Sequence, residues 1–180
     1  QTGFAHNHNV SINGGNDKTS YNASINYMNR EGVVRGTRMN RVNGRALVSS
    51  NVLNDHLKLS LGLNASEGHF RSVQMGNEGA SVLDGMYYYS PCDPVYNADG
   101  TFYEANGISQ YYNPMAMINQ DRFQHIRRRY QITANAVATI MPGHTWTVNY
   151  SYMTQQNMSS GYNSAYSQLV KTNGQDSRTT

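Results

Sequence analysis

The chain has 180 residues and a formal net charge of +3, and 38% of its residues are hydrophobic while only 14% are charged. A soluble domain usually carries about 25% charged residues, so the polarity of this chain comes mainly from Asn, Ser, Thr, Gln and Gly. The small net charge gives no basis for nucleic-acid binding. The chain contains no apolar run of the roughly 18 residues that a transmembrane helix needs, and its one cysteine excludes an internal disulfide.

Several segments alternate between apolar and polar residues with a period of two, which predicts β-strands with one apolar and one polar face. In chain order, these segments are residues 6–13, 19–29, 39–51, 56–66, 125–140 and 145–153. The clearest has leucine at every second position and a polar residue or glycine between, at Leu57, Lys58, Leu59, Ser60, Leu61, Gly62, Leu63 and Asn64. In segment 39–51, the more polar face contains Arg41, Asn43 and Arg45.

The connections between these segments alternate in length. Turns of a few residues follow the first, third and fifth segments, a medium loop covers residues 30–37, and long loops cover residues 67–124 and 154–180. Successive connections of an up-and-down meander lie at opposite ends, so the short turns gather at one end, as in outer-membrane barrels. We therefore predict an all-β fold, an antiparallel up-and-down meander of about six long strands that is part of a transmembrane β-barrel.

Strand length and aromatic placement indicate what the apolar face touches. Several segments exceed ten residues, whereas strands average about five or six residues in soluble proteins and need about nine to eleven to cross a membrane. On two segments, aromatic residues six positions apart, or about 20 Å, flank the apolar face as interfacial girdles do. We predict that these side chains face lipid: Leu57, Leu59, Leu61, Leu63, Tyr21, Tyr27, Trp146 and Tyr152.

Several consecutive motifs resemble the SusC/RagA-type TonB-dependent transporters. Residues 14–27 resemble a strand-turn-strand signature of that family, residues 31–36 the loop that follows it, and residues 41–45 its next strand. Residues 94–100, with the later Asn113-Pro114, resemble a recurrent external loop. The resemblance covers residues 7–152, which is nearly the whole chain.

This resemblance implies a barrel of about 22 strands with a plugged lumen in the outer membrane of Bacteroidota. The whole protein is then expected to import glycans or peptides with a SusD-like surface lipoprotein as its lid. The TonB complex would supply energy through a box in the plug region. This chain contains no recognisable plug, TonB box or barrel-closing strand, so we expect it to be a middle fragment of the barrel.

Two clusters are candidates for ligand contact. Aromatic rings suit stacking on sugar rings, although they also pack loops together, and the loop tyrosines are Tyr87, Tyr88, Tyr89, Tyr111 and Tyr112. Guanidinium groups bind phosphates in a bidentate manner, which makes Arg127, Arg128 and Arg129 candidates for lipopolysaccharide contact. In a strand, Arg127 and Arg129 share one face with His125 and Arg128 lies on the other, so solvated or lumen-facing charge is the alternative interpretation.

Nothing in the sequence indicates catalysis. No Ser/His/Asp arrangement, phosphate loop or carboxylate pair stands out, so we predict a protein that is not an enzyme and binds no cofactor. His6 and His8 share a strand face without a third ligand nearby, so no metal site is predicted. The alternatives to a transporter fragment are a soluble all-β carbohydrate-binding module with tyrosine-rich loops and a secreted structural β-protein.

Overall fold

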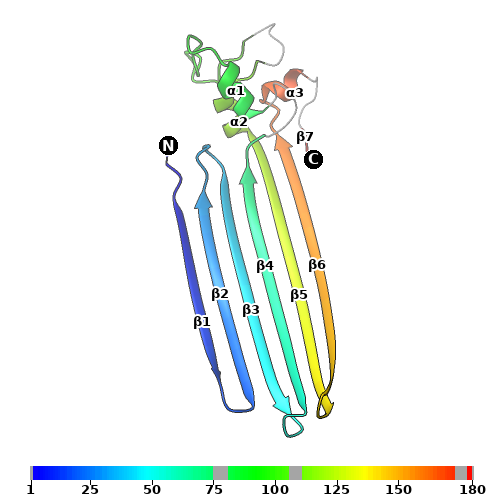
Figure 1. Ribbon diagram of the computed structural model, residues 1–180. Coiled ribbons are helices and arrows are strands. Elements are labelled where there is room, and N and C mark those ends of the chain that lie inside the picture. The colour runs from blue at the N-terminus through cyan, green and yellow to red at the C-terminus, as the bar shows by residue number, and fades with distance from the viewer. Residues whose placement is uncertain (1, 75–80, 106–110, 173–177, 180) are drawn as a thin grey trace.

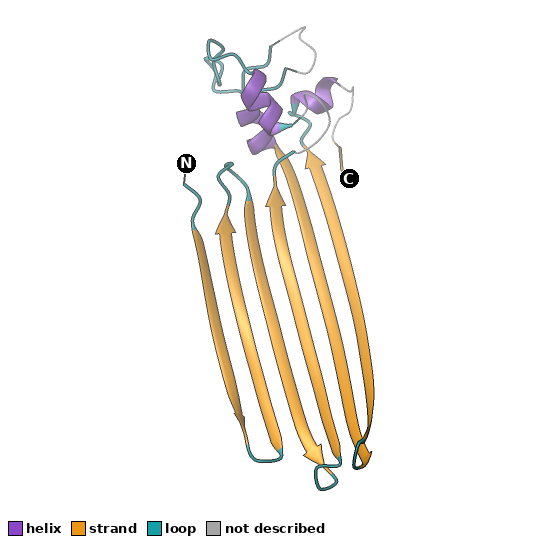
Figure 2. Cartoon of the chain, in the orientation of Figure 1, coloured by secondary structure: helices purple, strands orange, loops and turns teal. Residues whose placement is uncertain are grey.

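The computed structural model describes residues 2–74, 81–105, 111–172 and 178–179, which form one antiparallel sheet with helices at one end (Figures 1 and 2). The long strands of this sheet are β1 (Ala5–Gly15), β2 (Thr19–Glu31), β3 (Arg38–Val52), β4 (Leu57–Ser72), β5 (Asp121–Met141) and β6 (His144–Asn163). The strand order follows the chain, and a short β7 (Arg178–Thr179) pairs with the end of β6. The all-β, up-and-down antiparallel meander predicted from the sequence is confirmed.

The strands extend further than the alternation of apolar residues predicts. β4 continues to Ser72, β5 begins at Asp121, and β6 continues to Asn163. Residues 154–163 therefore lie in a strand and not in the predicted loop. These extensions carry polar residues on both faces, so the sequence shows no alternation of apolar and polar residues there. Backbone pairing with the neighbouring strand holds them in the sheet.

The short turns lie together at the end opposite the helices (Figure 1). In the first turn, the Asn16 Oδ1 accepts hydrogen bonds from the backbone N–H groups of Lys18 and Thr19, at 3.0 and 2.8 Å. The second turn places Leu53, Asn54 and Asp55 in the left-handed region, with φ of 56°, 51° and 68°. Both turns close an antiparallel pair, so the strands on either side stay in register.

The long loop after β4 folds into a cap at the other end of the sheet, near both chain termini (Figure 1). Its helices are α1 (Val82–Tyr88) and α2 (Pro114–Gln120), and α3 (Gln168–Thr172) follows β6. A small apolar core of Val73, Val82, Tyr112 and Met117 holds the cap, with Val34 and Ile118 packed against it. The buried Asn113 caps α2 and donates hydrogen bonds to the carbonyls of Val95 and Tyr103.

The buried apolar side chains belong to this cap. Among the described residues they are Val73, Val82, Tyr112, Ala116, Met117 and Val170, and none of them lies in the long strands β1–β6. The apolar face of the sheet is therefore not covered by any part of the chain that the structure describes. In that same part, no helix has both the length and the apolar character needed to cross a membrane.

Candidate functional site

The pairing register sorts the strand residues into two faces of different chemistry. One row across the sheet joins Tyr21, Val48, Leu61, Ala134 and Tyr150, which are paired in succession from β2 to β6. Side chains alternate along each strand, so every second row lies on the same side of the sheet as this one. We term that side the apolar face. The opposite side is the polar face.

The apolar face exposes large hydrophobic side chains. The exposed fraction is 46% for Val48, 49% for Leu61 and 69% for Trp146. The residues predicted to face lipid all fall on this face, namely Tyr21, Tyr27, Leu57, Leu59, Leu61, Leu63, Trp146 and Tyr152. A continuous apolar surface of this kind marks a contact with lipid or with another protein, because monomeric soluble proteins rarely expose one.

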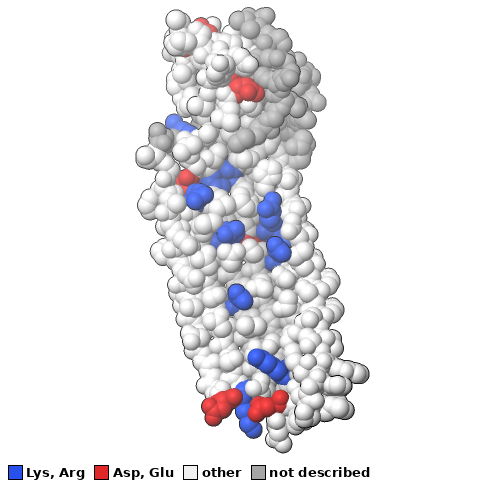
Figure 3. Space-filling view, viewed as in Figure 1, with Lys and Arg blue, Asp and Glu red and all other residues white. Residues whose placement is uncertain are grey.

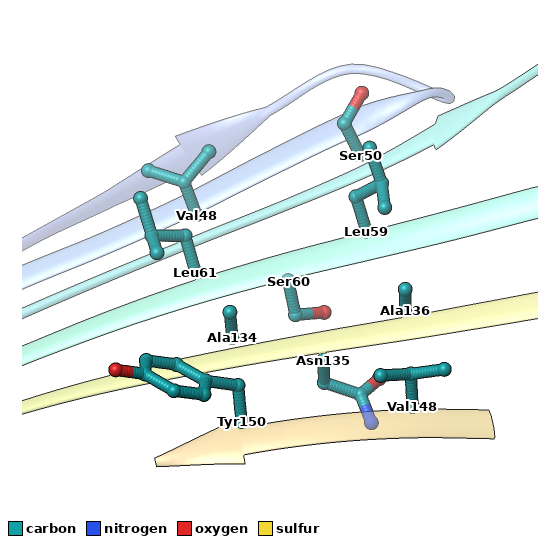
Figure 4. A pocket seen from close by; sticks show the side chains of 10 residues that line it. All are labelled: Val48, Ser50, Leu59, Ser60, Leu61, Ala134, Asn135, Ala136, Val148 and Tyr150. Carbon is teal, nitrogen blue, oxygen red and sulfur yellow. The ribbon is translucent and has the colours of Figure 1, made fainter. Parts of the chain in front are cut away.

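A shallow groove of about 300 Å³ follows β5 on the apolar face (Figure 4). Its floor is low because β5 presents the short side chains of Ala134 and Ala136 there. The walls are the longer side chains of neighbouring strands, Leu59 and Leu61 on β4 and Val148 and Tyr150 on β6. The groove is lined mainly by carbon atoms, so it offers dispersion contacts and few hydrogen bonds.

Charged residues follow the apolar residues on the same face, toward the cap. The Glu67 carboxylate accepts hydrogen bonds from Arg128 at 3.1 Å and from His69 at 2.8 Å. Arg38 pairs with Glu31 at 2.6 Å. The apolar face thus changes from hydrocarbon to paired charges along the strands, as a protein surface does where it leaves the membrane core.

The arginines that the sequence places in succession lie on different faces. Arg128 is on the apolar face beside Glu67, while Arg127 and Arg129 are on the polar face, opposite Gly68 and Ser66. One surface therefore cannot present all three guanidinium groups to a lipopolysaccharide head group. Arg128 alone remains a candidate for that contact.

The polar face carries a connected set of amide and hydroxyl groups. One row joins Asn9, Asn26, Asn43, Ser66 and Arg129. Ser66 donates to Asn43 at 2.7 Å, Asn43 donates to Asn26 at 3.4 Å, and Asn26 donates to Asn7 at 2.7 Å. Across β5 and β6, Asn135 also donates to Asn149. Small neutral polar groups of this kind are typical of the water-filled side of a barrel.

A groove of about 650 Å³ crosses the middle strands on the polar face, and we name it the polar groove. Its polar side chains are Ser24, Asn26, Arg41, Asn43, Arg45, Asn64, Ser66, Arg129 and Gln131, and Gly44 and Ala65 also line it. Figure 3 shows Lys and Arg side chains spread over the sheet, while acidic side chains gather mainly toward its two ends. The sequence identified Arg129 as a candidate contact but did not bring it together with Arg41 and Arg45, because that step requires the pairing register.

Three of the five loop tyrosines have structural roles in the cap. The Tyr89 and Tyr111 rings stack at 5.2 Å between centroids, with 14° between their planes. The Tyr111 hydroxyl donates to Asp93 at 2.6 Å and accepts from the Ser90 backbone N–H at 2.7 Å. The hydrogen bond to the Asp93 carboxylate raises the pKa of Tyr111. Tyr112 is 8% exposed and belongs to the core of the cap, so its ring has little surface for a ligand.

The remaining two loop tyrosines, Tyr87 and Tyr88, are exposed on α1. Tyr87 is 85% exposed and Tyr88 63%, and their rings meet edge to face at 5.4 Å. Of the tyrosines predicted to contact a ligand, these two present free ring surface to the outside.

The two histidines of β1 lie side by side at the edge of the sheet. The His6 and His8 rings lie 5.2 Å apart, and His6 also contacts the Tyr27 ring. Within the described ranges, no group of three or more His, Cys, Asp or Glu side chains is arranged to hold a metal ion.

Part of this chain is similar to the TonB-dependent receptor SusC. The SusC of Bacteroides thetaiotaomicron is 26% identical to the chain over 113 residues, which is 63% of this chain but 11% of that receptor. No protein-family model matches the chain. The similarity to SusC is therefore distant, and the chain corresponds to a small part of the length of that receptor.

Proposed function

We propose that this chain is a section of the β-barrel of an outer-membrane TonB-dependent importer that takes up glycans or peptides. The observation that carries the proposal is the exposed apolar face of a sheet of long strands whose other face is polar and hydrogen-bonded. In a barrel, the first face contacts acyl chains and the second faces the lumen. The distant similarity to SusC supports the same assignment.

The two ends of the sheet fit the two sides of an outer membrane. Short turns connect the strands at one end and the folded cap lies at the other (Figure 2). Outer-membrane barrels have short periplasmic turns and longer extracellular loops. We assign the cap to the cell surface, where Tyr87 and Tyr88 would contact a glycan, a peptide or a SusD-like lipoprotein. Arg128 would lie near the phosphates of lipopolysaccharide.

The energy for transport would come from the TonB complex, acting through a plug region that belongs to the rest of the protein. A barrel wall has no catalytic role, so we propose a transporter and not an enzyme. The exposed apolar face gives no support to a soluble carbohydrate-binding module, because such a module would need to cover that face to remain soluble.

Energised uptake by the full-length protein in its outer membrane tests this function. We expect cells that contain the protein to accumulate labelled oligosaccharides or peptides too large for porins. Accumulation should stop when the proton gradient is collapsed or when TonB is deleted. Uptake that continues without TonB would contradict the proposal, as would recovery of the full-length protein from the soluble fraction.

A further inference from the structure

Both faces of the sheet carry arginines, and only some of them are paired. On the apolar face, Arg38 pairs with Glu31 and Arg128 pairs with Glu67, while Arg71 and Arg122 form no ion pair with any described carboxylate. On the polar face, Arg41, Arg45, Arg127 and Arg129 are exposed and form no ion pair with any described carboxylate. Asp121 shares the polar face of β5, but it lies at the cap end of the strand, where it accepts from Ser167. The polar face therefore carries positive charge that the described residues do not neutralise.

The guanidinium groups of the polar face lie on neighbouring rows. Arg41 and Arg127 flank Gly68 in one row, Arg129 belongs to the next, and Arg45 belongs to the row after that. Rows on one face follow each other at about 7 Å, since two residues of a strand span that length. Three of these arginines, Arg41, Arg129 and Arg45, line the polar groove, so positive groups recur along it from row to row.

Side-chain contacts position Arg41, which lines the polar groove, and Arg127, which belongs to the same row but not to the lining of the groove. The edge of the Phe70 ring covers Gly68, between Arg41 and Arg127: a Cβ there would lie 2.9 Å from the Cε2 of Phe70 and 3.8 Å from the Cγ of Arg41. The Arg127 guanidinium lies 5.8 Å from the centre of the Phe70 ring, and its Nε donates to Asn157 at 3.2 Å. Such contacts reduce the entropy lost when an arginine binds an anion.

Neutral hydrogen-bonding groups fill the space between the charges. The groove is lined by amides and hydroxyls of Asn26, Asn43, Asn64, Ser66 and Gln131, and its described lining contains no aromatic or large aliphatic side chain. Amides and hydroxyls match the many hydroxyl groups of a sugar, while the apolar side chains of a mixed peptide would find no matching surface there. The composition of the groove thus favours a carbohydrate that carries acidic groups.

We propose that the polar groove binds the carboxylate groups of an acidic oligosaccharide as it passes through the barrel. Arg45 and Arg129 bind these carboxylates directly, and the neighbouring amides bind the sugar hydroxyls. This inference rests on the proposed importer function and adds the class of substrate. It requires that the protein distinguish acidic from neutral sugars of the same size.

The test uses the full-length protein in detergent and two probes of equal length. One probe is an oligogalacturonide, and the other is the same oligosaccharide after its carboxyl groups have been reduced to hydroxymethyl groups. Calorimetry should show tighter binding of the acidic probe, with an advantage that falls as salt is added. The double variant Arg45→Gln with Arg129→Gln should bind the acidic probe at least about tenfold more weakly, and it should bind the neutral probe as before.

A matched control removes the same charge from the other face. Arg71→Gln with Arg122→Gln changes two exposed arginines on the apolar side of β4 and β5, and we expect no change in the preference for the acidic probe. The variant Arg45→Lys with Arg129→Lys keeps the charge and should retain most of the preference. This variant also keeps the proposal testable if the glutamine variant fails to assemble.

Several outcomes would overturn the inference. Equal binding of the two probes by the unchanged protein is one. A preference for poly-glutamate over the oligogalacturonide is another. A third is an unchanged preference in the Arg45→Gln, Arg129→Gln protein, which would mean that these arginines contact another part of the full-length protein. Energised uptake of the neutral probe would leave the importer proposal standing in each case, whereas absence of uptake of either probe would count against both.

Discussion

Neighbouring residues of one strand in this sheet face different surroundings. Leu61 lies on the apolar face in a row with Val48 and Ala134. Ser60, the preceding residue, points to the polar face and shares a hydrogen bond of 2.9 Å with Ser49. A single step along the backbone therefore moves a side chain from a hydrocarbon surface to a hydrogen-bonded one.

This difference gives a direct test of the lipid-facing assignment. Leu61→Arg places a charge near the middle of the apolar face, and an arginine at the midplane of a bilayer costs a β-barrel about 2–4 kcal/mol. Ser60→Arg places the same charge on the polar face, where water reaches it. We expect Leu61→Arg to lower sharply the amount of heat-modifiable full-length protein in the outer-membrane fraction, and Ser60→Arg to lower it much less.

Leu61→Met serves as a control for the loss of the leucine itself, because it keeps an apolar side chain of similar volume. Equal assembly defects from arginine at positions 60 and 61 would show that the two faces do not separate lipid from water.

Among the secondary-structure elements, the sequence predicted the central parts of the strands but not their cap ends or the helices. Alternation identified the central part of each long strand, because those residues must separate apolar from polar surroundings. The cap ends of β4, β5 and β6 were not identified, since pairing with neighbouring strands holds their polar residues in place. The helices α1 and α2 were also missed, because each buries only a few side chains against the other loop segments.

The turn between β3 and β4 has an unfavourable backbone that substitution can relieve. Leu53 has a φ of 56° and is 70% exposed, so its side chain contributes little packing. A left-handed conformation costs an ordinary residue about 1–2 kcal/mol, while glycine adopts it freely and loses about 0.5–1 kcal/mol through chain entropy. We expect Leu53→Gly to leave the heat-modification midpoint of the full-length barrel unchanged or slightly raised.

The adjacent Val52 is the matched control, because it ends β3 opposite Leu57 and has no positive φ. Val52→Gly should lower the midpoint, since glycine weakens a strand. A similar decrease from both substitutions would show that the left-handed geometry of Leu53 does not limit stability.

At the scale of the whole molecule, the sheet has two open edges. β1 pairs only with β2 among the described strands, and β6 pairs with β7 only at Tyr162 and Asn163 beyond its long contact with β5. Unpaired backbone groups at a strand edge are sites of aggregation in water and are too costly to expose to lipid. The sheet thus requires further strands to complete a stable barrel.

We therefore expect a polypeptide of residues 1–180 produced alone to aggregate in buffer without detergent. The exposed apolar face and the open edges act together in this outcome. Size-exclusion chromatography and denaturant unfolding would check it, with the full-length protein in detergent as the control. A monomeric preparation that unfolds cooperatively without detergent would contradict both the membrane assignment and the incomplete barrel.

The two chemical faces and the meander follow from the amino-acid sequence alone, because a period of two is a local property that each strand carries in its own residues. Which residues of different strands meet depends on the pairing of those strands in the folded sheet. The register brought Arg41, Arg45 and Arg129 into the polar groove, and the packing of the loops in the cap buried Tyr112 while leaving Tyr87 exposed. These outcomes depend on contacts between residues far apart in the chain, which local alternation does not encode.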